Sequence, residues 1–265
     1  MTRSDDVSRR LGRKVLVGTA WSTVERFGSL GLQFAVNLVL ARLLTPAEFA
    51  YVGVLAFFMS VSYVLIDGGF ATALIQKQNP TRADYSVIFI WNMAFALFFY
   101  ALLFITAPLI ALYVNMPLLE DIIKVFSLSL PLSALSQVQI IRLRKELAFG
   151  FMAVVNLGGY AAGGALGIWL AMRGAGPWSL VWMQVCNMAV CAVCYNLFTR
   201  WHPGFVFSRE SFKQLFGYGG YLLMATVFQE ACKNVQTLII GRRFSPVQVG
   251  LYGQAHKLDQ INSYA

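Results

Sequence analysis

Charged residues are scarce in this sequence of 265 residues: they make up 12 %, whereas a soluble domain carries roughly a quarter. Hydrophobic residues reach 58 %, and the mean hydropathy is +0.62. This balance excludes an ordinary soluble globular domain and indicates a chain whose solvent is a lipid bilayer. The Lys and Arg excess lies mostly between long apolar runs, and no nucleic-acid-binding signature accompanies it. No nucleic-acid partner is therefore expected.

Cysteine and histidine are also few, which excludes several kinds of site. The four cysteines all fall in apolar segments, and the two histidines, His202 and His256, are far apart. Neither a disulfide framework nor a zinc site is predicted. The sequence also lacks a phosphate-binding loop, a nucleophile elbow, a zinc-protease motif and a dinucleotide-binding turn. We therefore expect neither an enzyme nor a cofactor nor a metal site, and an ATP-driven pump is disfavoured.

Apolar runs long enough to cross a membrane are abundant. About 20 helical residues span the hydrocarbon core of a bilayer, because every backbone polar group must be paired within the segment. This length predicts spans near residues 15–41, 49–75, 86–113, 121–141, 149–172, 178–199 and 215–240, with another beginning near 248. The predicted fold class is all-α, a polytopic membrane helical bundle.

Local signals divide and orient these spans. Thr45, Pro46 and Glu48 form a helix-start signal, with an N-cap, a proline at the first helical position and a glutamate at the third. Most Lys and Arg of the short loops fall on the side of the N-terminal segment, around residues 77–82, 142–145 and 200–213. The positive-inside rule therefore predicts a cytoplasmic N-terminus.

An internal repeat suggests two related halves. Residues 41–53 match residues 241–253, with the Arg, Pro and Gly positions identical. An even number of predicted spans separates the copies, so the repeat is parallel, and transporters built this way bind substrate between their halves. We predict a six-helix lobe over 1–200 and the start of a second lobe over 201–265. Because the second copy stops within its second span, we expect a complete protein of about twelve spans or more and no transport by this chain alone.

Two predicted spans carry polar faces. Spacings of three and four residues place their side chains along one side of each helix. The first face contains Ser22, Arg26, Ser29, Gln33 and Asn37, and the second contains Thr226, Gln229, Lys233 and Thr237, with Glu230 beside them. These faces either hold the bundle together by interhelical hydrogen bonds or line a cavity. In the second case Arg26 and Lys233 would suit an anionic ligand.

Three carboxylates within the predicted spans are candidates for ion coupling: Glu25, Asp67 and Glu230. Asp67 also precedes a glycine pair, which predicts either a hinge or break in the second span or a solvated cap of a new helix. Gly159, Gly163 and Gly167 recur every fourth residue, a pattern typical of close helix packing.

Residues 41–49 (ARLLTPAEF) and 67–76 (DGGFATALIQ) resemble the polysaccharide transporter family, the exporters and flippases of O-antigen and colanic-acid type. That family shares a superfamily with the MATE multidrug exporters. The resemblance implies a MATE-like bundle of two lobes in the bacterial inner membrane. It implies movement of undecaprenyl-diphosphate-linked oligosaccharide from the cytoplasmic to the periplasmic leaflet, with Arg26 and Lys233 as candidates for binding the diphosphate.

The expected partners follow from this resemblance. They are the lipid-linked oligosaccharide and membrane lipids, with other polysaccharide-assembly proteins as further candidates. Three other functions stay open: a MATE-like antiporter that exchanges drugs for cations, a membrane-embedded glycan polymerase or ligase, and a scaffold that does not transport. The antiporter would favour an acidic cavity, and the polymerase or ligase a large periplasmic loop.

Overall fold

The computed structural model describes residues 3–67, 69–77 and 80–199, together with 220, 223–229, 232 and 248. The predicted seventh span and the start of the eighth lie largely outside the described residues. Eight helices occupy the three long described ranges: α1 (Arg3–Leu43), α2 (Pro46–Asp67), α3 (Phe70–Gln76), α4 (Arg82–Val114), α5 (Leu119–Phe126), α6 (Ser129–Lys145), α7 (Phe149–Met172) and α8 (Trp178–Thr199). No strand occurs among the described residues, and the predicted all-α class is confirmed.

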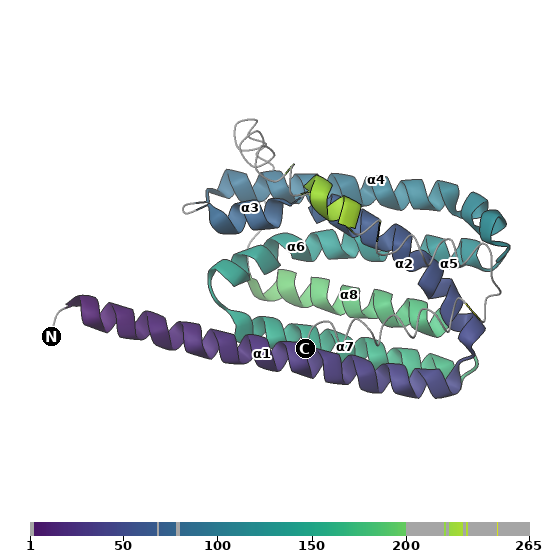
Figure 1. Cartoon of the computed structure of the whole chain (residues 1–265), viewed down its shortest axis with the longest axis horizontal. Coiled ribbons are helices and arrows are strands. Elements are labelled where there is room, and N and C mark those ends of the chain that lie inside the picture. Colours follow the sequence, from purple (N-terminus) through teal and green to yellow (C-terminus); the bar gives the residue numbers. More distant parts are fainter. Residues whose placement is uncertain are drawn as a thin grey trace.

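The helices have the length and composition of a membrane protein. Within the described part of the chain, α2, α4, α7 and α8 are each long and apolar enough to cross a bilayer. Figure 1 shows the helices running back and forth along one common direction. The chain is therefore a polytopic helical membrane protein.

Basic residues gather at one end of the bundle. The back-and-forth course brings together the end of α3, the start of α4 and the end of α6 (Figure 1). These ends carry Lys77, Arg82, Arg142, Arg144 and Lys145. Two of the loops that the charge count assigns to one side of the membrane, around residues 77–82 and 142–145, thus lie at the same end of the structure.

The start of α2 follows the predicted capping pattern. Pro46 is the first residue of the helix, where a missing N–H costs nothing. The backbone N–H and the hydroxyl of Thr45 both donate to Glu48 Oε2, at 2.6 and 2.9 Å. The predicted positions of Pro46 and Glu48 in the first turn of the helix are confirmed.

The second predicted span is broken after Asp67, as the glycine pair indicates. α2 ends at Asp67 and α3 begins at Phe70. Between them Gly69 has a φ of 69°, which a residue with a Cβ rarely adopts. With its amide nitrogen turned toward the carbonyls, Asn92 of α4 donates to the Ile66 carbonyl at 2.7 Å. A neighbouring helix therefore donates a hydrogen bond to a carbonyl in the last turn of α2.

The fourth predicted span is not one continuous helix, which corrects the expectation for residues 121–141. The chain forms α5 and then α6, joined through Ser127 and Leu128 in a tighter turn. Pro131 explains the interruption, because it has no N–H to donate to the carbonyl of Ser127. That carbonyl instead accepts from the Leu130 N–H at 3.0 Å.

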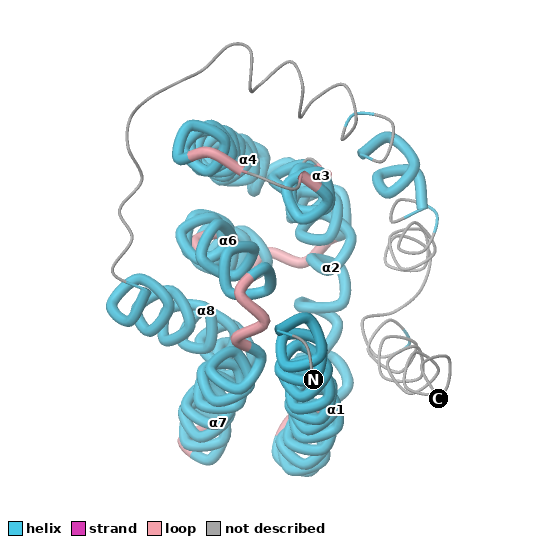
Figure 2. The backbone as a smooth tube through the Cα atoms, turned by 90° about the vertical axis from the view of Figure 1, so that its left-hand side faces the viewer, coloured by secondary structure: helices cyan, strands magenta, loops and turns pink. Residues whose placement is uncertain are grey.

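Viewed end-on, the bundle has two sides. α1 lies beside α7, and α7 packs closely on α8, while α2, α3, α4 and α6 form the other side (Figure 2). The predicted glycine contact is confirmed, since Gly159, Gly163 and Gly167 leave no room for a Cβ against α8. α6 contacts both α4 and α8 and so connects the two sides.

Candidate functional site

A cavity of about 340 Å³ lies where the two sides of the bundle face each other. Its walls come from α2 and α6 on one side and from α7 and α8 on the other. Figure 2 shows how these two pairs of helices are arranged end-on. Ile66, Ala134, Ile140 and Met188 contribute apolar surface. The remaining lining residues are polar or aromatic, which is costly within membrane-spanning helices and marks a candidate functional site.

Tyr63 and Asp67 of α2 and Gln137 of α6 form the first polar wall. Gln137 Nε2 donates to Asp67 Oδ1 at 2.8 Å. The Tyr63 hydroxyl lies 2.9 Å from the hydroxyl of Ser129, in the first turn of α6. The carboxylate at the broken end of α2 is thus held by a neutral amide, and two hydrogen bonds fix α2 against α6.

The opposite wall contains a chain of hydrogen bonds that reaches α1. The buried Tyr195 of α8 donates its hydroxyl to Asn156 Oδ1 of α7 at 2.9 Å. Asn156 Nδ2 in turn donates to Glu25 Oε1 of α1. Tyr195 and Asn156 both line the cavity. A carboxylate on α1 is therefore connected to the cavity wall through one amide side chain.

The predicted polar face of α1 reaches the cavity wall at one residue. Gln33 hydrogen-bonds with the hydroxyl of Tyr160, which lines the cavity. Ser29 and Asn37 are half-buried, and Asn37 Nδ2 donates to the Gln33 carbonyl at 2.8 Å within α1. Arg26 is exposed and is not part of the cavity lining.

The electrostatic character of the cavity is acidic. Among the described residues that line it, Asp67 is acidic and none is Lys, Arg or His. Arg144 interacts electrostatically with Asp67 from outside the lining. Within the described residues, no group of three or more His, Cys, Asp or Glu is placed to hold a metal ion. The cavity therefore offers hydroxyls, amides and a carboxylate as hydrogen-bonding partners.

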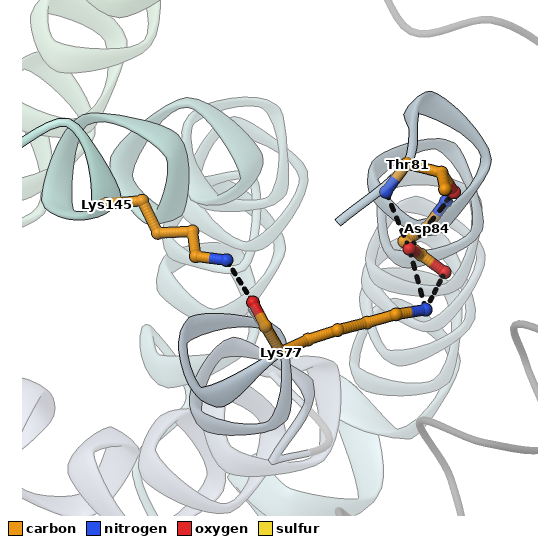
Figure 3. Close-up of polar contacts among 4 residues, drawn as sticks. All are labelled: Lys77, Thr81, Asp84 and Lys145. Atoms are coloured by element: carbon orange, nitrogen blue, oxygen red, sulfur yellow. Dashed lines mark hydrogen bonds and ion pairs between the residues drawn. The ribbon is translucent and has the colours of Figure 1, made fainter. Parts of the chain in front are cut away.

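A second polar cluster closes the basic end of the bundle (Figure 3). Lys77 Nζ lies 2.9 Å from the fully buried Asp84, which also accepts from the backbone N–H of Thr81 at 2.8 Å. Lys145 Nζ donates to the carbonyl of Lys77. Burial lowers the pKa of the Lys145 ammonium, the charge of Lys77 lowers it further, and Asp84 acts in the opposite direction. These contacts hold the ends of α3, α4 and α6 together.

Comparison with known proteins identifies the family. A family model described as polysaccharide biosynthesis protein matches residues 39–264, which is most of the chain. The chain belongs to the polysaccharide biosynthesis protein family. The family resemblance seen in residues 41–49 and 67–76 is thereby confirmed.

Curated relatives of this family member are named for polysaccharide biosynthesis in several bacteria. The teichuronic acid biosynthesis protein TuaB of Bacillus subtilis is 23 % identical over 94 % of this chain and 52 % of its own length. The succinoglycan biosynthesis transport protein ExoT of Rhizobium meliloti is 24 % identical over 94 % and 50 %. The lipopolysaccharide biosynthesis protein WzxC of Escherichia coli is 23 % identical over 94 % and 51 %. The chain spans about half the length of these relatives, and no solved structure matches it significantly.

The structure places some of the site residues predicted from the sequence at the cavity and others away from it. Glu25, Gln33 and Asp67 each contact or form the cavity wall, whereas Arg26 does not line it. Gln229 is exposed on a short described helical piece. Lys233, Thr237 and Glu230 lie outside the described residues.

The sequence interpretation missed most of the cavity wall. Asn156 and Tyr160 are four residues apart on α7, and Asn187, Cys191 and Tyr195 follow the same spacing on α8. This spacing puts each set on one helical face. Polar side chains at every fourth residue of a predicted span are therefore the sequence signal that identifies these two walls of the cavity.

Proposed function

We propose that this chain forms the first lobe of a flippase for surface polysaccharide. Its substrate is an undecaprenyl-diphosphate-linked oligosaccharide, and it moves this lipid from the cytoplasmic to the periplasmic leaflet of the bacterial inner membrane, with the N-terminus in the cytoplasm. The observation that carries this proposal is the family match over residues 39–264, together with relatives named for polysaccharide biosynthesis and transport. The protein acts as a transporter and not as an enzyme.

The substrate's chemistry explains why such a protein is needed. A diphosphate and a glycan cannot cross hydrocarbon unaided, because burying unpaired charges and polar groups is strongly unfavourable. The cavity between α2, α6, α7 and α8 supplies hydroxyl and amide groups among membrane-spanning helices. Polar surface of this kind lowers the cost of bringing a glycan into the membrane.

The two polar faces are the proposed substrate path between the lobes. Arg26 and Lys233 bind the diphosphate by charge-assisted hydrogen bonds. Ser29, Gln33 and Asn37 continue the face of α1, and Gln229 and Thr237 continue the second face. Glu25, Asp67 and Glu230 remain the candidates for ion coupling.

Deleting the gene in the organism that encodes the protein tests the function. We expect loss of one surface polysaccharide, and restoration by the complete natural protein. Arg26→Ala and Lys233→Ala should each reduce restoration, at equal membrane levels. Arg173→Ala is the matched control, because Arg173 stacks on Trp169 of its own helix, at 3.9 Å from the ring, and should restore fully.

The outcomes separate the function from the site. If every surface polysaccharide persists after deletion, the flippase proposal is wrong. If deletion removes a polysaccharide but both alanine variants restore it as well as the wild type does, the function stands and the diphosphate site lies elsewhere.

A cation-coupled drug antiporter is a second candidate function. It is favoured by one observation, namely that the described cavity lining includes Asp67 and contains no basic residue. This function predicts that deletion increases sensitivity to cationic drugs and leaves surface polysaccharide intact. Measuring drug susceptibility and surface polysaccharide on the same deletion strain distinguishes the two.

A further inference from the structure

Resting on the function proposed above, we propose that the cavity between α2, α6, α7 and α8 binds one neutral pyranose unit of the glycan. Its volume of about 340 Å³ is at the lower end of the range for small-molecule sites. A space of this size suits a single sugar ring and is too small for an oligosaccharide. The glycan would thus be recognised inside the first lobe, apart from the diphosphate.

The lining residues match the two kinds of surface that a pyranose presents. Tyr63 and Tyr160 provide aromatic rings with polar tips, which can contact the apolar C–H face of a sugar. Gln137 and Asn187 provide amides for ring hydroxyls. One N–H of Gln137 already donates to Asp67, so its other N–H and its oxygen fill this role. Polar groups placed beside apolar and aromatic surface are typical of sites that orient a neutral ligand.

The charge of the cavity argues against the diphosphate as its occupant. Asp67 lines the cavity, and no Lys, Arg or His is found among the described lining residues. Arg144 acts on Asp67 from outside the lining, whereas a phosphate inside the cavity would meet the carboxylate directly. Like charges repel strongly in a medium of low dielectric constant. The diphosphate is therefore expected at the exposed side of α1 that carries Arg26.

The same cavity is poorly suited to a bare metal cation. Hard cations are held by several oxygens at roughly 2.0–2.6 Å, which requires a compact cage. Here the oxygen-bearing residues are spread around a space of about 340 Å³ together with Ile66, Ile140 and Met188. Apolar wall atoms contact the C–H groups of a sugar favourably, but they provide no ligand for an ion.

Cys191 offers a direct reporter of occupancy, because it lines the cavity and is a free thiol. The experiment uses the complete natural protein with Cys191 as its single cysteine. Methyl methanethiosulfonate, a small neutral reagent, labels this thiol, and mass spectrometry follows the rate. Methyl glycosides of glucose, galactose, mannose and N-acetylglucosamine serve as competitors. Inorganic pyrophosphate and sodium chloride are the anionic and cationic alternatives.

We expect at least one methyl glycoside to slow labelling of Cys191, by about threefold at twice its dissociation constant. Pyrophosphate and sodium should leave the rate unchanged. A protein with Cys194 as its single cysteine is the matched control, because Cys194 lies on the same helix but outside the cavity lining. No glycoside should protect Cys194.

A cavity-filling pair adds a second test. Ser133 lines the cavity and donates to the Leu130 carbonyl of its own helix, whereas Thr106 of α4 makes the same kind of bond to Leu102 outside the cavity. Ser133→Leu should abolish glycoside protection of Cys191, and Thr106→Leu should preserve it.

Several results would overturn the sugar site. One is that Cys191 fails to react at all, or reacts at a rate that no glycoside slows. Another is that pyrophosphate or sodium protects it in place of glycosides, or that Ser133→Leu leaves the glycoside protection unchanged.

The single-cysteine protein is also tested for restoring polysaccharide export. If it restores export but shows no glycoside protection, only the sugar site is wrong; if gene deletion leaves surface polysaccharide intact, the proposed function is wrong.

Discussion

Gly163 allows α7 and α8 to approach each other closely, and replacing it with alanine should separate them. A Cβ at this position would lie 2.5 Å from the Met183 carbonyl oxygen, 3.0 Å from Asn187 Cβ and 3.2 Å from the Asn187 backbone nitrogen. Two of these three atoms belong to the backbone of α8, so a side-chain rotation cannot relieve the contact. Gly158, on the same helix, has no atom within 4 Å of the corresponding position and provides a matched control.

The expected size of the effect follows from the difference between these sites. Favourable non-bonded carbon contacts lie at about 3.5–4.0 Å, so α8 must move outward by a large part of an ångström to accept the Gly163→Ala methyl group. Overpacking of this kind typically costs about 1–3 kcal/mol. Alanine also favours a helix over glycine by about 0.5–1 kcal/mol, but both variants gain this and it cancels. Gly163→Ala should therefore be about 2 kcal/mol less stable than Gly158→Ala, roughly a 30-fold difference in the unfolding equilibrium.

Reversible unfolding in mixed detergent micelles can measure this difference. The complete natural protein is titrated with a denaturing detergent, and far-ultraviolet circular dichroism reports the loss of helix. Gly158→Ala should unfold at or slightly above the wild-type midpoint, and Gly163→Ala clearly below it. If the two variants unfold within about 0.5 kcal/mol of each other, the close approach of α7 and α8 does not limit stability and the reasoning fails.

Three further predictions concern charges and hydrogen bonds. Asp84→Ala should cost about 2–3 kcal/mol in the same unfolding assay, because it leaves Lys77 without its partner and removes the carboxylate that accepts from the Thr81 N–H at the start of α4. Glu146→Ala, at an exposed ion pair, should cost less than about 0.5 kcal/mol, and equal costs would contradict the structure. Tyr195→Phe should cost about 1 kcal/mol by leaving the half-buried amide oxygen of Asn156 without its donor, and wild-type stability would argue against that bond. A cationic methanethiosulfonate should label Cys191 at least about fivefold faster than an anionic one, relative to the same ratio at Cys194; equal ratios would contradict an acidic cavity.

Sequence signals predicted a helix boundary correctly where the residues that end or start the helix lie within a few positions of it. The start of α2 follows from a cap and a proline within four residues, and the break after Asp67 follows from the glycine that adopts a positive φ at position 69. The division of α5 from α6 also has a local cause, Pro131, but hydropathy alone conceals it. An apolar run keeps its hydropathy when a proline interrupts its hydrogen bonds, so the proline must be considered separately.

The cavity itself could not be predicted from the same signals. Periodicity shows which side chains share a face of one helix, but not which neighbouring helix that face meets. Glu25 illustrates this, since its position beside the polar face of α1 gave no indication that Asn156 would be its partner. The link between Asp67 and Gln137, which are far apart in sequence, likewise depends on how α2 and α6 pack. Such contacts are properties of the tertiary structure.

The arrangement of charge suggests how the proposed first lobe could handle the proposed substrate, which has two chemically different parts. Glu25 and Asp67 are each held by a neutral amide next to the cavity, so the interior keeps carboxylates without a basic lining residue among those described. The described cations lie elsewhere, Arg26 on the exposed surface of α1 and Lys77 at the end of the bundle. A diphosphate is attracted to the cations and repelled by the carboxylates, whereas a neutral sugar is repelled by neither. Separating the two kinds of group in this way would allow the headgroup and the glycan of one lipid to occupy different places on the same lobe.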